Sequence, residues 1–414
     1  MTAAVIRHTD ACRVCGNTDL VRVLDLGEQT LTGVFPRSRD EQVTRGPLAL
    51  VKCHGEGHCG LLQLEHTYDA AEMYGAGYGY RSGLNPTMSR HLNARAQQIL
   101  SMEGLRAGDR VVDIGSNDGT SLNAFPGDAG LHLLGIDPSG GKFRQYYRPD
   151  VSLLPDFFSA ALLSQHAGER SARVISSYSM FYDLDQPLEF AREVASSLVD
   201  GGLWVFEQSY MPTMLSQNAY DTVCHEHLEY YGLRQIAWIA ERAGFSIERV
   251  EFNDINGGSF CVFARKTGGA PRHSGVVGTI IGIEESRELH TLAPYRAFSE
   301  RVDLCRDELR SFLERSAEAG RKICGLGAST KGNVVLQHAG IGPELLPVIG
   351  EVNPDKFGCF TPGSLIPIVP EEEVLGMDPD ALLLLPWHFE AFFRNSGKFA
   401  RTSLVAPLPW LRML

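Results

Sequence analysis

The chain has 414 residues, which is enough for two or three domains, and its 43% hydrophobic and 21% charged content is ordinary for a globular protein. A formal net charge of -12 argues against a nucleic-acid partner, because such a partner requires a basic surface. No apolar run approaches the ~20 residues that span a bilayer, and the N-terminal residues lack the apolar core of a signal peptide. We therefore expect a cytoplasmic protein without a membrane partner, in which the nine cysteines do not form structural disulfides.

Two groups of cysteines near the N-terminus predict a structural zinc site. Cys12 and Cys15 have the C-x-x-C spacing of a metal-binding knuckle, and Cys53 and Cys59 form a second group. Five residues, two of them histidines, separate Cys53 from Cys59, so the fourth ligand is open; we favour four cysteines. The alternative is a set of reduced cysteines without metal. A closed four-ligand site would be structural rather than catalytic and would stabilise a small region with little core.

Residues 67–85 form an unusual segment in which glycines separate several tyrosines and Arg81 follows. Glycines give such a loop conformational freedom and tyrosines give it polar tips, so it can close over a bound substrate. The alternative is a plain surface linker. The apolar spacing of residues 86–103 then predicts a helix that leads into the first strand of the next unit.

Residues 109–120 predict a nucleoside-binding unit, around which the rest of the chain is organised. A buried β-branched strand runs into a turn that contains Gly115 and Gly119, and a second apolar run at 131–136 ends at Asp137. In a unit of strand, glycine turn, helix and strand, an acid at the end of the second strand is placed to hold a ribose diol.

The turn differs from a dinucleotide-binding fingerprint. Asn117 occupies the position of the middle glycine, and Asp113 and Asp118 would repel a pyrophosphate. A cationic ligand such as S-adenosylmethionine (SAM) fits these acids better, and the spacing resembles the first motif of class I SAM-dependent methyltransferases. The alternative is an ordinary turn between a strand and a helix.

The segments between residues 86 and 266 match the order of a class I methyltransferase sheet. We predict strand ends at 153–158 and 172–183, a helix at 188–198, a strand at 202–207, a helix at 233–243, and a closing hairpin of 245–252 and 259–264. The third strand end would place Asp156 and Phe157 near an adenine, and the end of the fourth would face the reacting methyl group.

Residues 220–231 contain two histidines, His225 and His227, on either side of Glu226. Together with Cys224 they could form a metal site, or they could act as acid and base, because histidine titrates near neutral pH. A core or surface cluster is the remaining alternative. The methyltransferase topology would bring this segment beside the sulfonium of SAM, which favours acid–base chemistry.

The last third of the chain predicts a second α/β domain. After a helical linker at about 283–317, a strand and a glycine-rich turn span 322–333, and further strands are expected at 346–352 and 381–386. The turn is a degenerate dinucleotide fingerprint, so a complete NAD site is an alternative that the pattern leaves open.

Four features occur in this order along the chain: the cysteine knuckle, a Tyr-Gly-Tyr-Arg-Ser-Gly loop, the predicted SAM turn and a Cys-His-Glu-His-Leu-Glu-Tyr-Tyr segment. In this combination the chain resembles, over nearly its whole length, the sugar C-methyltransferases, which methylate nucleotide-linked 4-keto-deoxysugars at C3. The resemblance implies an α/β fold with an N-terminal zinc-binding knuckle domain (1–70), a central class I SAM methyltransferase domain of Rossmann-like type (71–282), and a C-terminal Rossmann-like α/β domain that holds the sugar nucleotide (283–414).

The resemblance implies a reaction through an enolate. The C4 ketone acidifies the C3 proton, a base removes it, and C3 then attacks the methyl group of SAM; we expect His227 to be the base, Glu226 to orient or polarise it, and Tyr78 to close the site. The implied partners are a dTDP- or GDP-linked sugar, SAM and structural zinc, and the implied state is a monomer. Two other classes stay open: a SAM-dependent O- or N-methyltransferase, and a non-catalytic zinc-containing scaffold that binds SAM.

The residue patterns and the resemblance together assign the site residues. For catalysis they give Tyr78, His225, Glu226 and His227. For SAM they give Tyr80, Asp113, Gly115, Asn117, Asp118, Gly119, Asp137, Pro138, Asp156, Phe157, Phe158, Ser177 and Ser179. For the sugar nucleotide they give Arg81, Tyr182, Ser329, Lys331, Asn333, Asn353, Lys356 and His388, with Lys331 and the turn amides near the phosphates.

Overall fold

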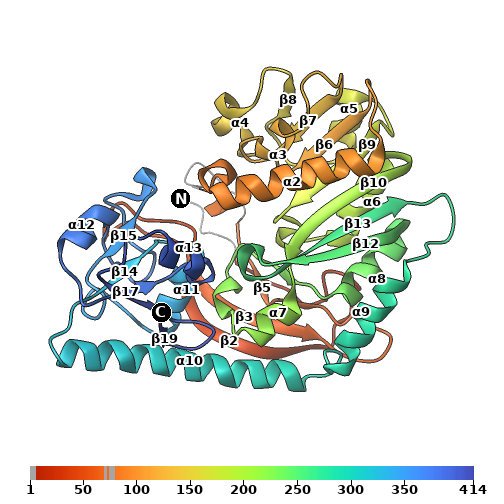
Figure 1. Cartoon of the computed structure of the whole chain (residues 1–414). Helices are drawn as coiled ribbons and strands as arrows, with labels where there is room; N and C mark the ends of the chain where they lie inside the picture. The colour runs from red at the N-terminus through yellow and green to blue at the C-terminus, as the bar shows by residue number, and fades with distance from the viewer. Residues whose placement is uncertain (1–5, 70–71, 74–79) are drawn as a thin grey trace.

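The computed structural model describes residues 6–69, 72–73 and 80–414, and the chain is built on three principal β-sheets. A four-stranded sheet forms most of the N-terminal region, a seven-stranded sheet forms the central unit, and a six-stranded sheet forms the C-terminal unit. Figure 1 shows the N-terminal strands, in red, below the central unit and beside the blue C-terminal unit. This architecture confirms the predicted α/β class.

The N-terminal sheet has the order β11-β4-β3-β2, and its neighbouring strands are antiparallel. Its strands are β2 (Leu20–Thr30), β3 (Arg45–Cys53), β4 (Leu62–Leu64) and β11 (Glu229–Tyr230), and a separate pair is formed by β1 (Arg7–His8) and β5 (His66–Thr67). The edge strand β11 belongs to the predicted catalytic segment: Glu229 pairs with Gln63 and Tyr230 with Leu62. This pairing holds the segment against the N-terminal region.

The central sheet has the order β12-β13-β10-β9-β6-β7-β8, in which β6 to β10 are parallel and β13 is antiparallel to both of its neighbours. The strands are β6 (Arg110–Ile114), β7 (His132–Ile136), β8 (Val151–Leu154), β9 (Ala172–Tyr178), β10 (Leu198–Ser209), β12 (Phe245–Asn253) and β13 (Ser259–Lys266). The order and the closing hairpin confirm the methyltransferase sheet predicted from the sequence.

Helices cover both faces of the central sheet, because its parallel strands are apolar on both sides. Val111 packs with Ala96 and Ile99 of α2, whereas the next residue, Val112, packs in the core that contains Val194 of α6. The helices of this unit are α2 (Pro86–Glu103), α3 (Thr120–Asn123), α4 (Gly140–Phe143), α5 (Ala160–Ala167), α6 (Pro187–Ser197), α7 (Met211–Ser216) and α8 (Leu233–Ala243). Figure 1 shows α2 lying across one face of the sheet.

Helix α2 has clear start and stop signals in the sequence. Asn85 Oδ1 accepts a hydrogen bond from Thr87 N at 2.9 Å, and Pro86 occupies the first turn, where its missing N–H costs nothing. Gly104 ends the helix in the left-handed conformation, with φ 53°. The predicted helix at 86–103 is therefore confirmed, and its first turn directly follows the glycine- and tyrosine-rich segment.

The C-terminal sheet has the order β16-β15-β14-β17-β18-β19 and is parallel apart from the β18–β19 pair. Its strands are β14 (Ile323–Leu326), β15 (Ile349–Glu351), β16 (Ile368–Pro370), β17 (Ala381–Leu384), β18 (Ser403–Ala406) and β19 (Arg412–Met413). Its helices are α11 (Thr330–His338), α12 (Glu371–Gly376) and α13 (Glu390–Asn395). The glycine-rich turn lies between β14 and α11, at the carboxyl edge of the sheet.

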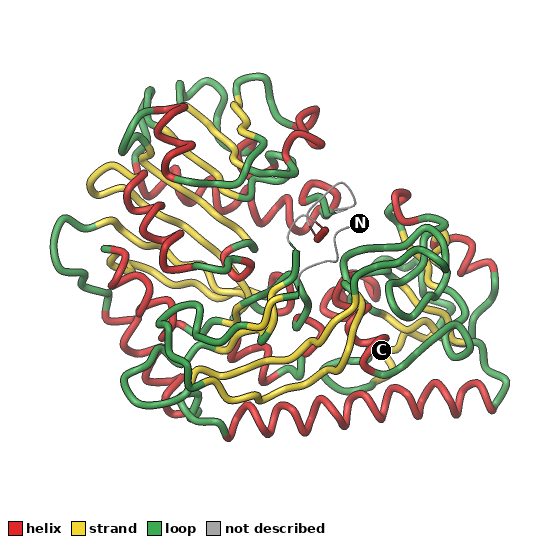
Figure 2. Tube along the Cα trace, turned by 180° about the vertical axis from the view of Figure 1, so that it is seen from behind, coloured by secondary structure: helices red, strands yellow, loops and turns green. Residues whose placement is uncertain are grey.

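Two helices replace the predicted helical linker, namely α9 (Gly275–Ser286) and α10 (Ala293–Glu318). Helix α10 packs against β2, α7 and β14, so it contacts all three units. Figure 2, which views the molecule from behind, shows this helix running along the edge of the molecule beneath the long N-terminal strands. Among the described residues, no helix is both long enough and apolar enough to cross a membrane.

Short 3-10 helices mark several turns next to the site. They are η1 (Ser82–Leu84), η2 (Arg144–Tyr146), η3 (Phe181–Asp183), η4 (Tyr220–Thr222), η5 (Ile255–Gly257), η6 (Pro354–Lys356) and η7 (Trp387–Phe389). Three of them, η3, η4 and η5, bring parts of the central unit towards the C-terminal unit and the N-terminal sheet.

Candidate active site

The four predicted cysteines come together into one cluster. Their sulfur atoms all lie within 4.8 Å of one another, with Cys12 Sγ 3.4 Å from Cys59 Sγ and Cys15 Sγ 3.6 Å from Cys53 Sγ. A tetrahedral zinc ion with Zn–S bonds of ~2.3 Å holds its sulfur ligands roughly 3.8 Å apart, so the cluster fits zinc. Within the described ranges this is the group that could hold a metal, which confirms the four-cysteine choice and gives no support to a metal site at the His-Glu-His segment.

The predicted SAM turn has the backbone geometry that its sequence requires. Gly115 and Gly119 have φ values of 72° and 76°, and Asn117, in the middle of the turn, has φ 49°. Asn117 N donates to Asp137 Oδ2 at 2.8 Å, and Ser139 N donates to Asp137 Oδ1 at 2.7 Å. Asp137 therefore fixes the turn, and its predicted contact with a ribose stays a prediction; Pro138 beside it is exposed.

Asp113, at the end of β6, is buried and accepts a hydrogen bond from Ser176 Oγ at 2.6 Å. Burial raises the pKa of Asp113 to about 7; the hydrogen bond from Ser176 opposes this rise and the nearby Asp137 carboxylate adds to it. A carboxyl group in this state gains most from a neighbouring cation, which fits the chemistry of a sulfonium ligand.

The end of the tyrosine-rich segment is fastened to the SAM turn. Ser82 N donates to Asn117 Oδ1 and Gly83 N donates to Asp118 Oδ2, both at 2.9 Å. A Cβ on Gly83 would lie 2.6 Å from Asp118 Oδ2, so this close approach requires glycine. Arg81 Nε lies 3.6 Å from Asp118 Oδ2. The structure thus places Arg81, which we assigned to the sugar nucleotide, beside the SAM turn.

Of the two tyrosines that the sequence assigns to the site, the structure describes Tyr80. Tyr78 lies outside the described residues. Tyr80 has a side chain that is 48% exposed, and its carbonyl oxygen accepts a hydrogen bond from Asn117 Nδ2 at 3.2 Å. The backbone of Tyr80 is therefore tied to the cofactor turn, and its hydroxyl interacts with Ser82.

The residues predicted to contact the adenine directly follow β8, and their two phenylalanines lie in different surroundings. Phe157 is 61% exposed, and its backbone N donates to Asp156 Oδ1 at 2.7 Å. Phe158 packs edge-on against Phe190 of α6, with ring centroids 5.3 Å apart. An exposed ring of this kind is available to stack on a base, whereas Phe158 already contributes to the core.

The two serines assigned to SAM lie in different surroundings. Ser177 is buried, and its hydroxyl accepts a hydrogen bond from Trp204 Nε1 at 3.2 Å inside the core. Ser179, with φ 54°, lies beyond the strand end, and its Oγ accepts from Asn256 Nδ2 at 3.3 Å. Of the two, Ser179 lies at the carboxyl edge of the sheet, where a ligand can reach it.

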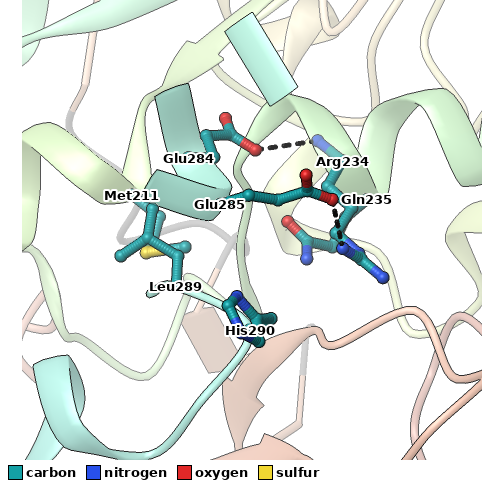
Figure 3. Close-up of a pocket in the computed structure, with 7 residues that line it drawn as sticks. All are labelled: Met211, Arg234, Gln235, Glu284, Glu285, Leu289 and His290. Atoms are coloured by element: carbon teal, nitrogen blue, oxygen red, sulfur yellow. Dashed lines mark hydrogen bonds and ion pairs between the residues drawn. The ribbon is translucent and has the colours of Figure 1, made fainter. Parts of the chain in front are cut away.

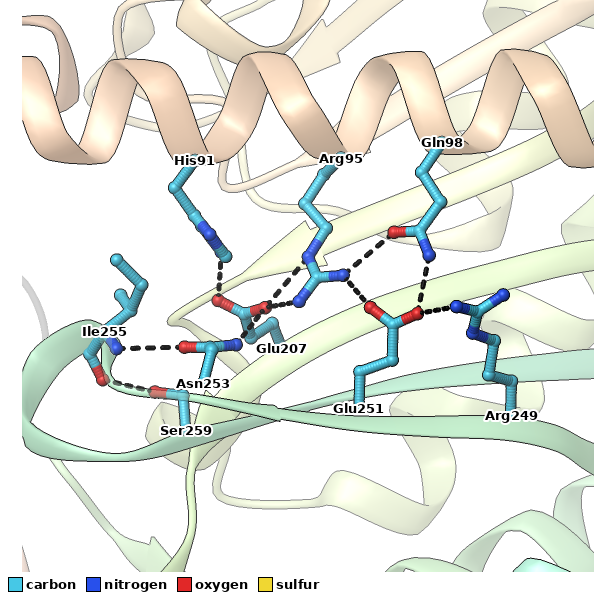
Figure 4. Close-up of polar contacts among 9 residues, drawn as sticks. All are labelled: His91, Arg95, Gln98, Glu207, Arg249, Glu251, Asn253, Ile255 and Ser259. Carbon is cyan, nitrogen blue, oxygen red and sulfur yellow. Dashed lines mark hydrogen bonds and ion pairs between the residues drawn. The ribbon is translucent and has the colours of Figure 1, made fainter.

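A buried polar network connects α2 to the sheet at the same edge (Figure 4). Glu207, near the end of β10, lies 2.5 Å from His91 Nε2 and accepts from Arg95 Nη2 at 2.9 Å. Arg95 also contacts Glu251, and Asn253 Nδ2 donates to Glu207 Oε2 at 3.0 Å. Sequence reasoning missed this network, although an acid at the end of the predicted strand 202–207 was a signal for it.

The three residues of the His-Glu-His segment point to different neighbours. His225 is fully buried and packs edge-on against Tyr68, with ring centroids 4.6 Å apart. Burial lowers the pKa of His225 to about 3, and the backbone of Gln29 and Gly46, in the N-terminal strands, opposes this. His225 thus packs into the N-terminal region, while Glu226 and His227 face other partners.

Glu226 lies where the N-terminal and C-terminal units meet. Thr32 Oγ1 donates to Glu226 Oε2 at 3.4 Å, and a Cβ on Gly33 would overlap Glu226 Oε1. The same Cβ would lie 3.7 Å from Thr330 Oγ1 at the start of α11. Burial raises the pKa of Glu226, so this carboxyl group is poised to give or share a proton.

His227 has the arrangement expected of a base. Its Nδ1 lies 2.8 Å from Thr222 O; a carbonyl oxygen only accepts, so Nδ1 carries the proton and Nε2 carries the lone pair. Tyr182 packs edge-on against the imidazole at 4.4 Å. Burial, together with the positive charge of Lys331, lowers the pKa of His227 to about 4 against the opposing hydrogen bond to Thr222, so the ring is neutral at neutral pH.

His227 also lines a small cavity. The lining residues are Tyr182, Ser209, Met211, Met214, Thr222, His227, Glu229 and Tyr230. A second hollow shares only Met211 with this lining (Figure 3), and there Glu284 accepts hydrogen bonds from Leu233 N at 2.6 Å and Arg234 N at 3.1 Å. Glu284 thereby caps the start of α8, and none of the predicted site residues lines this second hollow.

Two lysines of the C-terminal unit flank its glycine-rich turn. Lys331 Nζ donates to Asn256 O of the central unit at 2.9 Å. Lys356 Nζ donates to Ala328 O of the turn at 2.7 Å and lies 4.0 Å from Glu351 Oε2. Burial lowers the pKa of Lys356. Both cations therefore lie at the carboxyl edge of the C-terminal sheet.

The other residues assigned to the sugar nucleotide have mostly structural partners. Ser329 Oγ accepts from Gly332 N at 3.0 Å and Asn353 Oδ1 accepts from Asp355 N at 3.1 Å, so both cap short helices. Asn333 is buried and donates to Thr32 O at 2.8 Å, which joins α11 to the N-terminal region. His388 is half-buried, and burial lowers its pKa to about 3.

Three sequence families match consecutive parts of the chain. A zinc binding domain matches residues 12–74, a methyltransferase domain matches residues 88–250, and a C-methyltransferase C-terminal domain matches residues 254–409. The C-methyltransferase NovU of Streptomyces niveus is 28% identical over 421 aligned residues, which cover 99% of this chain and 98% of that protein.

Two similar solved structures each cover 44% of this chain. A chain from the complex of the Haloferax volcanii Trm112 methyltransferase activator with a methyltransferase is 17% identical, with 44% of this chain and 95% of that chain covered, at a TM-score of 0.36. A SAM dependent methyltransferase of Aquifex aeolicus is 18% identical, with 44% and 99% covered, at a TM-score of 0.32. TM-scores this low do not bear on the function of this chain.

Proposed function

Because the chain belongs to the SAM-dependent C-methyltransferases, we propose that it transfers a methyl group to C3 of a nucleotide-linked 4-keto-deoxysugar through an enolate. The SAM turn and the four-cysteine zinc cluster supply the methyl donor site and the structural support. The sugar substrate is our inference, and it rests on one observation above others: a neutral imidazole, His227, is oriented by Thr222 O and lies within the electrostatic influence of Lys331 from the C-terminal unit.

A carbon nucleophile requires a base, and His227 is the residue best suited to this role. Its Nδ1–H is held by Thr222 O, so Nε2 is free to remove a proton. The C3–H bond breaks, its proton moves to Nε2, and the electron pair forms the enolate of the C4 ketone. C3 then attacks the methyl group of SAM, the ketone re-forms, and S-adenosylhomocysteine (SAH) leaves with the bonding pair on sulfur.

Glu226 and Tyr182 are proposed to support this base. Glu226 has a raised pKa and lies across Gly33 from Thr330 at the start of α11, so we infer that it shares a proton with the sugar ketone or with a neighbouring hydroxyl. Tyr182 packs on the imidazole of His227 and fixes its plane. We propose that the sugar nucleotide, carrying dTDP or GDP, lies along the glycine-rich turn of the C-terminal unit, and that the protein acts as a monomer.

The first experiment incubates the protein with a dTDP-4-keto-deoxysugar, with and without SAM. We expect a mass gain of one methylene with SAM, and exchange of the C3 proton for deuterium in D2O with SAH in its place. A methyl transfer to oxygen or nitrogen needs no carbon-acid base and would leave the C3 proton in the sugar. Such a result would contradict the proposed function.

A matched pair of histidine variants tests the base. His227→Ala should lose both methylation and C3 exchange by ~100- to 10,000-fold, because a positioned base contributes about that factor, and SAH should bind as before. His290→Ala is the control, since His290 lines the second hollow and not the cavity of His227. Unchanged exchange in His227→Ala would assign the base to another residue.

A further inference from the structure

Lys331 extends from the C-terminal unit to the reacting edge of the central unit. Its Nζ donates to Asn256 O at 2.9 Å, and Asn256 Nδ2 in turn donates to Ser179 Oγ at 3.3 Å. Ser179 directly follows the end of β9, on the edge of the sheet where the SAM turn also lies. The ammonium group is therefore placed at the cofactor edge rather than only at the phosphate side of its own turn.

The turn that holds Lys331 is itself rigidly supported. Asn253 Oδ1 accepts from Ile255 N at 2.9 Å, and Ser259 Oγ donates to Ile255 O at 2.8 Å (Figure 4). Asn253 also donates to Glu207, which anchors α2. Asn256 has φ 55°, a conformation that this set of contacts maintains. The position of the Asn256 carbonyl, and with it the lysine, is thus fixed by the central unit.

The same lysine lies beside the proposed base. Helix α11, which carries Lys331 in its first turn, packs against η4, whose last residue is Thr222. Thr222 O holds His227 Nδ1 at 2.8 Å. The positive charge of Lys331 lowers the pKa of His227 and of His388, in each case after burial. Base and ammonium are therefore close enough to share one substrate.

The charge of Lys331 acts on the buried Asp221, whose pKa it lowers against the effect of burial. Among the described residues, no carboxylate lies within ion-pair distance of Lys331 Nζ, and Asn256 O uses one of its three N–H donors. Lys356, on the same edge of the C-terminal sheet, lies 4.0 Å from the Glu351 carboxylate. Within the described part of the chain, Lys331 thus differs from Lys356 in having no ion-pair partner, and it keeps N–H donors for a further acceptor.

These contacts, together with the proposed function on which this step rests, point to a second catalytic residue. We propose that the Lys331 ammonium stabilises the enolate oxygen formed at C4 when His227 removes the C3 proton. Negative charge develops on that oxygen only during the reaction, and the ammonium donates a hydrogen bond to it. When C3 takes the methyl group from SAM, the charge leaves the oxygen, and Lys331 returns to its resting contact with Asn256.

The expected loss of rate follows from the contribution that oxyanion-stabilising donors make in other enzymes. Removing one donor to a developing oxyanion typically slows a reaction by about 100- to 1,000-fold, because the donor is already oriented in a site that excludes water. A lysine that only binds a phosphate contributes to the affinity for the nucleotide and leaves the rate at saturation unchanged. The two roles therefore predict different measurements.

The test measures C3 proton exchange in D2O, with SAH bound and the sugar nucleotide at saturation, in the full-length zinc-loaded protein. Lys331→Met should slow exchange by ~100- to 1,000-fold, with the affinity for dTDP changed by less than about threefold. Lys331→Arg, which keeps the charge, should retain a larger share of the rate. Lys322→Met is the control: Lys322 precedes β14 at the opposite end of the strand, and its Nζ donates to Met377 O at 2.9 Å.

Each outcome has one meaning. Slow exchange with unchanged dTDP affinity supports the proposal, whereas normal exchange at saturation with weakened dTDP affinity assigns Lys331 to the phosphates and overturns it. Absence of exchange in the unaltered protein would instead contradict the proposed function. If Lys331→Met loses zinc or SAH binding, Lys331→Ala with added methylammonium replaces it. Recovery of exchange by that cation supports the proposal, and lack of recovery in a variant that still binds SAH and dTDP opposes it.

Discussion

The central and C-terminal units contain the same backbone motif, with side chains of opposite charge around it. Each has a parallel sheet whose first strand runs into a glycine-rich turn and a helix: β6 before α3 in the central unit, and β14 before α11 in the C-terminal unit. The first turn is surrounded by Asp113, Asp118 and Asp137, and the second by Lys331 and Lys356. Under the proposed function, one fold serves a cationic cofactor in one place and an anionic ligand in the other, and side-chain charge distinguishes the two.

The largest effect should come from separating the two turns, which the N-terminal region holds together. Cys59→Ser removes one of four zinc ligands, and structural zinc contributes about 10–16 kcal/mol to folding. We expect loss of zinc and of all methyl transfer, with SAH still bound by the central unit. Zinc content by elemental analysis and SAH titration by calorimetry measure the two properties. His58→Ala is the control, because His58 stands outside the cluster; zinc lost from this variant would contradict the four-cysteine site.

A smaller effect should follow at the acidic turn. Asp137→Ala removes the acceptor of the Asn117 and Ser139 backbone hydrogen bonds and a contact for the ribose. Hydrogen bonds to a charged group contribute about 1.5–3 kcal/mol, so SAM affinity should fall ~10- to 100-fold. Affinity for dTDP should stay the same. The exposed Asp128 offers the control Asp128→Ala, and equal losses of SAM affinity in both variants would refute a specific role for Asp137.

A substitution at the basic turn of the C-terminal unit should weaken nucleotide binding and leave binding at the SAM turn unchanged, the reverse of the Asp137 variant. Lys356 Nζ holds Ala328 O in the turn, so Lys356→Met should weaken dTDP binding by about 5- to 10-fold, or roughly 1 kcal/mol, and leave SAH binding unchanged. The loss should shrink at high salt, because screening weakens the attraction between the lysine and the phosphates. Titration of dTDP at two ionic strengths measures it. A salt-independent loss would mean that Lys356 acts through packing alone.

The smallest effect concerns the protonation of Asp113. Burial raises its pKa to about 7 from an ordinary value near 4, so its contribution to stability is complete below about pH 4 and is lost as the pH rises through 7. A sulfonium favours the carboxylate, so the preference for SAM over SAH should increase about two- to fivefold between pH 6 and pH 8. Parallel titrations of both ligands give this ratio. In Asp113→Asn the ratio should be flat, and a pH dependence that survives there belongs to another group.

Local chemistry explains which parts of this molecule could be predicted from sequence. A zinc knuckle, a glycine turn after a strand and an acid at the next strand end are each encoded within a few consecutive residues. Cys12 and Cys15 and the Gly115 turn accordingly have the geometry that their spacing implies. The order of strands in the central sheet followed from the alternation of apolar runs and helical segments.

The remaining features depend on contacts between distant parts of the chain. Nothing near Lys331 indicates that its ammonium lies against Asn256, and nothing near Glu207 indicates His91 as its partner. Arg81, in a loop that resembles a substrate lid, lies beside Asp118, and Gly83 allows the backbone of this loop to approach the Asp118 carboxylate. Such contacts are set by how the three units pack, which a local pattern does not contain.

The pairing of β11 with β4 also bears on how this protein is made. Residues 62–63 are synthesised early, yet their edge partners at 229–230 leave the ribosome after most of the central sheet. The N-terminal sheet therefore spends that interval with an open edge, and long-range pairing of this kind slows folding. We expect zinc to hold the nascent knuckle in shape during this delay, and a chain released before residue 230 to expose an edge that attracts other strands. Transplanting the zinc region onto another methyltransferase would likewise require this small strand to travel with it.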